Sequence, residues 1–482
     1  MFDLLVLTGS AMKRSSRELI VATGLLMLLS CWACESPNDR PDTRESAPAT
    51  QPASVDQSAS RGQPSVEWSA PITVAEGAAR AGPWRMNDST FHYVDDPTVD
   101  ITADGKVGVA WVDNQAQTVR FQAFGRDGEP VFDEPTAVSR SPETFSWLPR
   151  LVLTGPPENH VYILWQEIVF SGGSHGGEAF FARSTDGGQS FGEPQNLSNT
   201  TNGVGKGRLT EEIWHNGSLD LAVGPEGTVF TAWTSYQGPL HVGRSTNAGR
   251  TFSDPLHVAG DAETPARAPS IAVEDAETVH LAWTVGEDDG ADLRLATSDD
   301  GAESFGEPSI ILESEGHSDA PKLAVDDEGT LHLAYGESPE GMFEQYHVRY
   351  ARKAKSKEGF GSSRRLSEAS ETSVQGAHFP SLALGTRDTF LMLWNLYPTG
   401  EHPPRGLGFT ASVDGGASFN GPSAVPGSTA ESLGINGSLQ GMLMEKIAAN
   451  ESGKVAVVNS RFKRGVASRI RLYRGQIQGA PE

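Results

Sequence analysis

The sequence predicts an all-β protein, a seven-bladed β-propeller closed by its N-terminal strand. Three short patterns carry this prediction, and each recurs seven times at intervals of roughly 60 residues. Repeats of this length are typical of four-stranded blades packed around an axis. A six-bladed ring of the same kind is the alternative fold.

The first pattern, an aromatic residue followed three positions later by proline, marks an outer strand. It occurs at Trp68/Pro71, Phe132/Pro135, Phe191/Pro194, Phe252/Pro255, Phe305/Pro308 and Phe419/Pro422, and Phe360/Ser363 fills the remaining place.

The second pattern is a run of alternating apolar residues that ends in an aromatic residue. It covers residues 107–111, 161–165, 229–233, 279–283, 331–335 and 390–394, and a seventh copy at 455–458 is followed by Asn459 in place of the aromatic residue. A period of two with many β-branched residues predicts a strand.

The third pattern precedes each of these strands and predicts the inner strand of each blade. Its copies lie at residues 97–99, 149–151, 218–220, 269–271, 321–323, 380–382 and 438–440. The chain begins with a lone outer-strand mark at Trp68, whereas the last inner strands have none. We therefore expect the N-terminal strand to complete the last blade.

Composition narrows the possible functions. The 482 residues include 53 glycines and 30 prolines, which indicates many turns, and the formal net charge of −24 makes nucleic acid an unexpected partner. Because both cysteines, Cys31 and Cys34, precede the repeats, the body has no disulfide, no cysteine–zinc site and no cysteine nucleophile. We expect no cofactor and no metal site. The acidic loop 326–329 leaves calcium open as an alternative, without an EF-hand ligand spacing.

The N-terminus has the pattern of an export signal. Lys13, Arg14 and Arg17 precede a short apolar run, residues 19–30, that ends at Cys31. Leu-Leu-Ser-Cys resembles the lipobox of bacterial lipoproteins, which implies acylation of Cys31, with Cys34 as the alternative. An ordinary cleaved signal is the other interpretation. We expect a signal segment at 1–34, a disordered tether at 35–64 and the propeller at 65–478, exported and anchored in a bacterial cell envelope.

A second motif, Ser-x-Asp-x-Gly-x-Ser/Thr-Phe, occupies the turn before the outer strand. It is complete at residues 184–191 and 412–419 and varied at 245–252 and 298–305. The serine and aspartate side chains should accept backbone N–H groups within the turn, and glycine supplies a positive φ. We interpret these turns as structural. The motif resembles that of the Asp-box (bacterial neuraminidase repeat) propellers of the sialidase superfamily, over roughly residues 65–476. The resemblance implies a carbohydrate ligand.

The strand order predicts that long, variable loops share one face of the ring. Aromatic residues, carboxylates and amides gather in these loops, as at Trp147, His317 and Asp319, and such mixtures suit sugars. The substrate-binding candidates are Arg150, Trp214, His215, Tyr236, His378 and Arg461.

Arg267-Ala268-Pro269 resembles the Arg-x-Pro of sialidases. The resemblance implies that Arg267 binds a substrate carboxylate, with Arg150 and Arg461 as further arginines. It also implies an acid/base aspartate at Asp289, in the loop 286–292. Glu212 with Tyr397, or with Tyr236, is the candidate nucleophile pair. This chain departs from the family pattern in three ways: the motif lies in the fourth repeat, Ala266 replaces an aromatic residue, and seven blades are expected where sialidases have six.

Two functional hypotheses follow. The first is an exo-α-sialidase-like glycoside hydrolase. The second is a non-catalytic propeller that binds a glycan or a protein. In both we expect a monomer whose partners are a glycan or glycoprotein and, through the lipid, a membrane.

Overall fold

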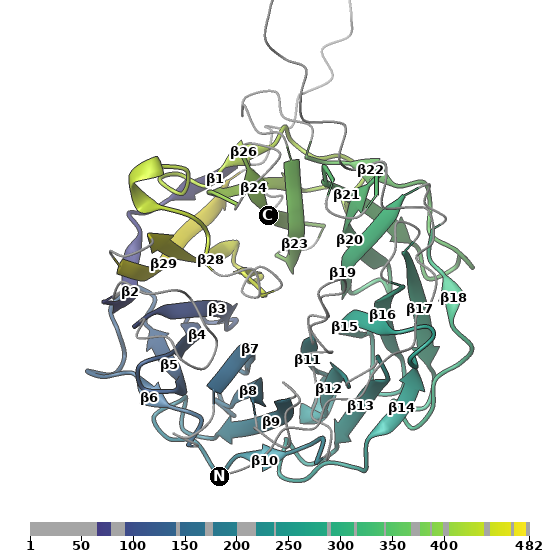
Figure 1. The fold of residues 1–482 in the computed structure, drawn as a ribbon, viewed down its shortest axis with the longest axis horizontal. Helices are drawn as coiled ribbons and strands as arrows, with labels where there is room; N and C mark the ends of the chain where they lie inside the picture. Colours follow the sequence, from purple (N-terminus) through teal and green to yellow (C-terminus); the bar gives the residue numbers. More distant parts are fainter. Residues whose placement is uncertain are drawn as a thin grey trace, which may run out of the picture. The chain divides into compact units, whose positions relative to one another are not determined.

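Seven antiparallel sheets form a closed ring in the computed structural model (Figure 1). The structure describes residues 65–78, 92–140, 145–168, 177–199, 218–235, 238–286, 291–312, 316–341, 344–367, 376–385, 388–398, 404–437, 444–463 and 467–478. These residues contain no α-helix, only the short 3-10 turns η1 (Pro225–Gly227) and η2 (Glu431–Leu433). The prediction of an all-β, seven-bladed propeller is confirmed, and the six-bladed alternative is wrong.

Six blades are continuous in sequence, with the first strand nearest the axis. Blades one to three are β3 (Val94–Ile101), β4 (Val107–Asp113), β5 (Thr118–Phe124) and β6 (Thr136–Ala137); β7 (Phe145–Leu153), β8 (Val161–Ile168), β9 (Gly177–Ser184) and β10 (Gln195–Asn196); and β11 (Leu219–Val223), β12 (Val229–Thr234), β13 (Leu240–Ser245) and β14 (Leu256–Ala259). Blades four to six are β15 (Ala266–Val273), β16 (Val279–Val285), β17 (Asp292–Ser298) and β18 (Ser309–Ile310); β19 (His317–Val325), β20 (Leu331–Ser338), β21 (His347–Lys353) and β22 (Arg364–Arg365); and β23 (Gly376–Leu384), β24 (Phe390–Tyr397), β25 (Leu407–Ser412) and β26 (Ser423–Ala424).

The seventh blade joins the two ends of the propeller. Its strands are β27 (Ile447–Ala449), β28 (Lys454–Lys463) and β29 (Ala467–Gln478), completed by β1 (Ser65–Trp68) and β2 (Ile72–Gly77), which both pair with β29. The expected closure by the N-terminal strand is confirmed. The first strand of this blade begins at Ile447, so the prediction of an inner strand at 438–440 placed it too early; those three residues lie outside the described part of the chain.

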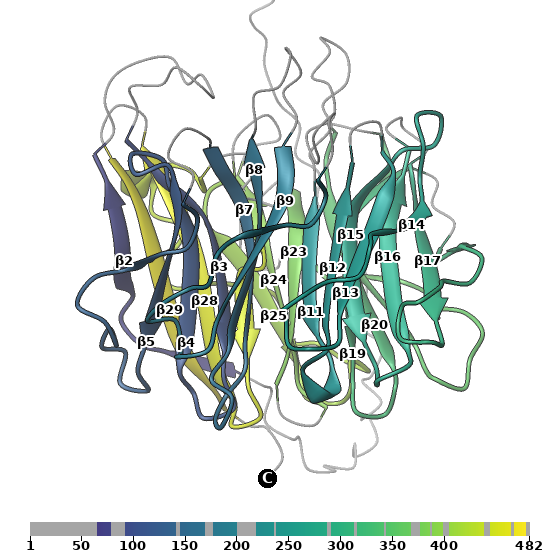
Figure 2. The same cartoon turned by 90° about the horizontal axis from the view of Figure 1, so that it is seen from below.

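Seen from its edge, the ring has two faces, with the strands running between them (Figure 2). We call the face where first strands begin and second strands end the connection face. The turn face is the opposite one, where each first strand turns into its second, as at residues 102–106.

The core lies between neighbouring sheets, where the second-strand aromatic residues are buried. Trp111, Trp165, Trp233, Trp283 and Trp394 are each at most 2% exposed. In blade seven Asn459 stands at this position, and the side chain of Asn436 occupies the neighbouring space. The Asn436 amide oxygen accepts bonds from Asn459 Nδ2 (3.0 Å) and Gly406 N (2.9 Å), and its nitrogen donates to Asn395 Oδ1 (3.0 Å). The hydrogen-bonded amide of Asn436 therefore takes the place of the apolar contact that the second-strand aromatic residue makes in the other blades.

The Ser-x-Asp turns contain the hydrogen bonds predicted for them. In the turn 412–419, Ser412 Oγ accepts from Gly416 N (3.0 Å), and Asp414 Oδ1 accepts from Ser418 N (2.7 Å). The phenylalanine that ends each turn packs against the third strand of the preceding blade, as Phe419 does against Tyr350 at 4.9 Å. Through this phenylalanine, each turn therefore packs its blade against the preceding one.

Side chains of the first strands connect blade to blade around the axis. In each bond a backbone N–H in a first strand, or directly before it, donates to a side chain of the preceding blade. The pairs are Leu148/Asp96, Leu153/Asp100, Ala268/Ser218, Ile271/Asp220, Leu323/Ser270 and Lys446/Ser381. The last pair brings residues 444–446 to the axis, where Glu445 O also accepts from Val99 N at 3.2 Å.

Candidate functional site

The same β-bulge recurs in the first strand of five blades. In each, the strand register shifts around a proline, and the residue before that proline has a φ near +50°. These residues are Asp96, Leu148, Ala268, Ala320 and Phe379. A bulge bends the strand and re-aims the neighbouring side chain. The side chain two positions before the proline therefore takes an equivalent place in every blade, at the connection face: Asp95, Trp147, Arg267, Asp319 and His378.

Three of these equivalent residues, from blades four to six, belong to one cluster. The Arg267 guanidinium donates to Asp319 Oδ2 (3.4 Å), to His317 Nε2 (3.1 Å) and to Gly286 O (2.8 Å). Thr284, opposite Arg267 on β16, donates to Asp319 Oδ1 at 3.1 Å. Because arginine can only donate, Nε2 of His317 is the acceptor in this contact.

His378 lies in a slot within this cluster. Its ring stacks on Tyr346 (centroids 3.8 Å apart, planes 11° apart) and on Phe379 (3.9 Å). A Cβ atom on Gly336 would lie 2.1 Å from His378 Nδ1, so only glycine leaves room for the imidazole. Tyr346 also meets His317 edge-on at 5.9 Å. The aromatic rings thus link blade five to blade six.

The charges of the cluster follow from its burial. Burial lowers the pKa of His378 to about 3, against the opposing effect of Asp319, so this imidazole is neutral at neutral pH. Burial alone would raise the pKa of Asp319, but the adjacent Arg267, which is always charged, holds it well below its usual range. Asp319 is therefore a permanent carboxylate, and it cannot serve as a proton donor.

Exposure decides which groups can touch a ligand. His317 and His378 are at most 5% exposed, whereas Tyr346 and Tyr397 are partly exposed and the Arg267 side chain is 15% exposed. Tyr397, at the end of β24, lies beside Tyr346, and burial raises the pKa of its phenol. The cluster therefore presents one guanidinium and two phenols to the connection face, supported by two buried imidazoles and a carboxylate.

Arg150 lies deeper, in a buried polar ring around the axis. The ring consists of the residue that follows the proline in each of the five bulged strands, together with the residues at the same position in blades three and seven. These are Thr98, Arg150, Asp220, Ser270, Lys322, Ser381 and Lys446. All seven are at most 6% exposed. Arg150 contacts Met444 Sδ (3.0 Å) and faces Asp220 at 3.9 Å, while Lys322 pairs with Glu445. These contacts hold Arg150 within the buried polar ring around the axis.

Arg461 holds a loop of blade seven. Its guanidinium donates to the backbone carbonyls of Ser428 (2.6 Å), Gly434 (2.8 Å) and Ala430 (3.1 Å), and to Asn436 Oδ1 (2.8 Å). Arg461 is 2% exposed. Arg150, Arg267 and Arg461 thus each contact different partners. The contacts described here do not bring the three guanidinium groups together, as binding of one carboxylate by all three would require.

The remaining predicted residues are placed as follows. Tyr397 and His378 lie in or beside the Arg267 cluster. Glu212, Trp214, His215, Tyr236, Asp289 and Cys31 lie outside the described residues. The cluster also contains His317 and Asp319, which the sequence indicated only as part of the polar loop face, and Thr284 and Tyr346, which it did not indicate. The Xaa-Xaa-Pro spacing shared by Arg267, Asp319 and His378 is the sequence signal that could have found the bulge positions.

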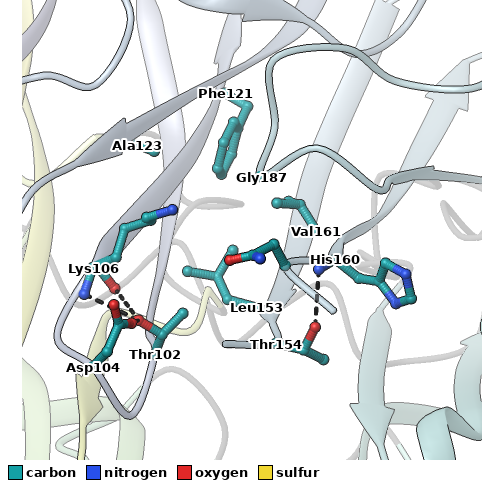
Figure 3. A pocket seen from close by; sticks show the side chains of 11 residues that line it. Thr102, Asp104, Lys106, Phe121, Ala123, Leu153, Thr154, His160, Val161 and Gly187 are labelled. Carbon is teal, nitrogen blue, oxygen red and sulfur yellow. Dashed lines mark hydrogen bonds between the residues drawn. The ribbon is translucent and has the colours of Figure 1, made fainter. Parts of the chain in front are cut away.

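Other features of the described residues give no second site on this face. A small pocket between blades one and two lies on the turn face, lined by residues such as Lys106, Phe121 and His160 (Figure 3). It holds about 10 Å³, room for about one water molecule. Within the described ranges, no group of three or more metal-ligating side chains occurs, and no helix is long and apolar enough to span a membrane. Asp326, in the loop considered for calcium, accepts bonds from Thr330 N and from His332.

Comparison with known proteins identifies the fold. No family model and no curated protein matches the sequence. An ulvan lyase, described as a new family of polysaccharide lyase, is similar over 83% of this chain and 95% of that chain, with 10% identity and a TM-score of 0.50. An α-L-arabinanase of Penicillium chrysogenum complexed with arabinobiose is similar over 84% and 98% (12% identity, TM-score 0.47), and a leech intramolecular trans-sialidase over 66% and 68% (11%, 0.43). At these identities the likeness shows a shared β-propeller fold.

Proposed function

We propose that this chain binds an acidic glycan at the connection face and cleaves it by β-elimination at the Arg267 cluster. The carrying observation is the grouping of one guanidinium and two partly exposed phenols, Tyr346 and Tyr397, over two buried imidazoles, of which His378 is neutral. Arg267 would bind the carboxylate of a uronate unit, because a guanidinium matches a carboxylate in shape and charge. In a chain of net charge −24, this local cation also offsets the repulsion of an anionic ligand.

Elimination suits these residues better than hydrolysis. Glycoside hydrolysis commonly uses two carboxyl groups, of which one must be protonated. The cluster as described holds one carboxylate, Asp319, which is kept ionised by Arg267. The sialidase-like alternative needs further arginines on the substrate, and Arg150 and Arg461 are bound elsewhere.

The proposed step balances within the site and the substrate. Arg267 stabilises the uronate carboxylate, which makes the adjacent C5–H more acidic. The step requires Tyr346 to be deprotonated when it takes the C5 proton; the electron pair then forms the C4=C5 double bond, and the C4–O bond breaks. Tyr397, whose phenol keeps its proton because burial raises its pKa, donates that proton to the leaving oxygen. The likeness to an ulvan lyase at a TM-score of 0.50 supports the choice of reaction class.

One assay separates the three candidate activities. The purified chain is incubated with a polyglucuronate, with the same polymer after carboxyl reduction, and with a sialoside. Elimination predicts new ultraviolet absorbance from a conjugated double bond, with the acidic polymer alone. New reducing ends without that absorbance would mean hydrolysis, and binding without either product would mean a non-catalytic propeller; both results overturn the proposal.

Variants test the assigned roles. R267M should weaken binding of the acidic polymer, whereas Y346F and Y397F should retain binding and lose turnover at least a hundredfold. Arg120→Met is the matched control, because Arg120 pairs with Asp113 on a blade outside the cluster. Equal turnover in R267M and R120M would contradict the site assignment.

We further propose that the chain belongs to the Asp-box superfamily and is exported and lipid-anchored through Cys31. The Ser-x-Asp turns and the N-terminal signal pattern support this. Mass spectrometry of membrane-fraction protein should find an acylated N-terminal cysteine. A cleaved, unmodified N-terminus would contradict the anchor.

A further inference from the structure

Positive charge is concentrated on one blade of this acidic protein. Residues 347–367, in the outer half of blade five, include seven of the 38 lysines and arginines but only one of the 62 acidic residues. The equivalent stretch of blade two, residues 178–198, has one arginine and three acidic residues. We call residues 347–367 the basic strip. It contains β21, β22 and the turn between them, and β22 is the outermost strand of the blade (Figure 1).

The turn in the basic strip lacks the side chains that hold the Ser-x-Asp turns together. The turn of blade two has Ser184 and Asp186, whereas blade five has Lys353 and Lys355 at the same distances before the phenylalanine. A lysine ammonium group can only donate hydrogen bonds, so it cannot accept the backbone N–H groups of the turn. The exchange therefore removes hydrogen bonds from the turn and adds positive charge.

Several of these cations are exposed and have no acidic partner. Arg352, Lys357 and Arg364 are exposed, and Lys353 is half-buried. In the part of the chain that the structure describes, no carboxylate lies within ion-pair distance of these four side chains. Arg352 and Arg364 donate to backbone carbonyls of the turn 412–419, which are neutral and leave the two charges uncompensated.

The other cations of the basic strip add little to the stability of the sheet. Arg349 pairs with Glu337 at 2.9 Å, and Lys355 pairs with Glu274 of blade four. Arg349 also lies directly opposite Arg365 in the β21–β22 pair, and like charges at opposite positions destabilise a sheet. Because the fold gains little from so much positive charge, the charge indicates a binding surface.

The basic strip begins at the Arg267 cluster. Tyr346, which stacks on His378, directly precedes β21 at the connection face. From there β21 runs antiparallel to β20 towards the turn face. At the rise of a β-strand, its seven residues span roughly 23 Å. A polymer bound at the cluster can therefore continue along the rim of blade five.

Acidic residues on the neighbouring turns restrict the shape of the partner. Exposed acids lie on the turn face in blades four, five and six: Asp275, Glu277, Asp327, Glu328 and Asp388. A broad anionic surface such as a membrane would meet these carboxylates together with the lysines and would be repelled. A single polymer chain can follow the basic strip without covering them. The charges therefore favour a linear polyanion.

We propose that the basic strip binds the part of a long acidic polysaccharide that extends beyond the Arg267 cluster. The inference rests on the proposed function for the identity of the polymer. Acidic groups along the polymer would meet the lysines and arginines of the strip. Long chains should therefore bind more tightly than short fragments, and more so at low salt.

The test compares long and short ligands in two triple variants of the full-length chain. The strip variant replaces three cations by glutamine: Lys353, Lys357 and Arg365. The control variant makes the same change at exposed arginines of blades one, three and seven: Arg126, Arg250 and Arg469. All proteins also carry Y397F, so that the polymer stays uncleaved, and calorimetry measures binding of polyglucuronate and of a glucuronate disaccharide.

We expect the strip variant to bind the polymer about tenfold more weakly than its parent at low salt, and equally well at high salt. Its affinity for the disaccharide should be unchanged, and the control variant should bind both ligands as the parent does. Unchanged polymer binding in the strip variant would overturn the proposal. Equal weakening in both triple variants would do the same, because the effect would then be one of net charge.

Two further probes separate other anionic partners. Inorganic polyphosphate bound as tightly as polyglucuronate would reduce the basic strip to a general anion-binding surface, and phosphatidylglycerol vesicles bound through the strip would make the partner a membrane; either result overturns the proposal. Cleavage by the unchanged chain together with full polymer binding in the strip variant would show that this inference alone fails. Weaker polymer binding in the strip variant, without cleavage by the unchanged chain, would show that the proposed function alone fails.

Discussion

Replacing Arg461 by methionine should destabilise the propeller without removing a substrate contact. The guanidinium donates to four acceptors between 2.6 and 3.1 Å, of which three are backbone carbonyls of the loop 428–434. Burial lowers the pKa of Arg461 to about 10, so it stays protonated at neutral pH. Methionine keeps much of the length and apolar bulk, and the loss is therefore mainly that of the hydrogen bonds.

The magnitude follows from these bonds. Hydrogen bonds to a charged donor contribute about 1.5–3 kcal/mol each, but they are not additive within one network. Removing one member of a buried charged network typically costs about 3–5 kcal/mol. For roughly 400 folded residues, an unfolding entropy of about 2.1 cal/mol/K per residue converts this to a fall in Tm of about 4–6 °C.

The matched control is Arg469, which lies directly opposite Arg461 on β29. It pairs with Glu76 at 2.8 Å, but both side chains are about half exposed. R469M should therefore cost at most about 1 kcal/mol. Urea unfolding of both variants gives the free energies, and amide hydrogen exchange should show faster exchange in residues 428–437 of R461M alone.

A different outcome would refute this reasoning. If R461M and R469M unfold alike, while R461M alone loses glycan binding, then Arg461 is a ligand-binding residue, as the comparison with sialidases implied. The structural role would then be wrong.

Four further predictions concern other parts of the molecule. Burial raises the pKa of Asp100 to about 6. The folded state therefore binds more protons than the unfolded state between pH 4 and 6, and the free energy of unfolding falls as pH rises through that window. In urea titrations D100N should be the more stable protein at pH 7, and the difference should vanish near pH 4. The depressed pKa of His378 acts in the opposite direction: the unfolded state takes up the proton first, and stability should be lost as pH falls from about 6.5 towards 3, with H378N showing a smaller loss. Gly336→Ala should displace the His378 ring, reduce turnover and lower the Tm, because the added methyl group overpacks the slot; unchanged turnover would contradict the slot. Deletion of residues 65–76 removes β1 and most of β2, exposes β29 and should lower the Tm markedly in calorimetry, whereas an unchanged Tm would contradict closure by this strand.

The arrangement of the blades could be predicted because its causes are local. Period-two apolar runs, turn residues and one aromatic residue per blade each act within a few residues, so the second-strand tryptophans fell where the pattern placed them. The seventh blade was harder to predict because Ser438-Leu439-Gln440 imitates Ser218-Leu219-Asp220. Asn459 was the visible sign of an exception, but its partner Asn436 could not be inferred from local pattern.

The candidate site could be predicted only in part, because its contacts join different blades. Arg267 and Asp319 are 52 residues apart, and His378 comes from a third blade. Periodicity gives the position of a residue within its blade, but not which charged neighbour it meets. For the same reason the sequence made Arg150 a substrate-binding candidate, although its register directs it into the axis.

The pairing of Ser65 with Gln478 has a consequence for how the ring can be rewired. The first and last described residues lie side by side at the turn face, in one antiparallel strand pair. A short peptide could join them, and new termini could be opened at another exposed turn, as in a circular permutant. A peptide joined directly to Ser65 or Gln478 would therefore be attached at the turn face, whereas Arg267 lies at the connection face.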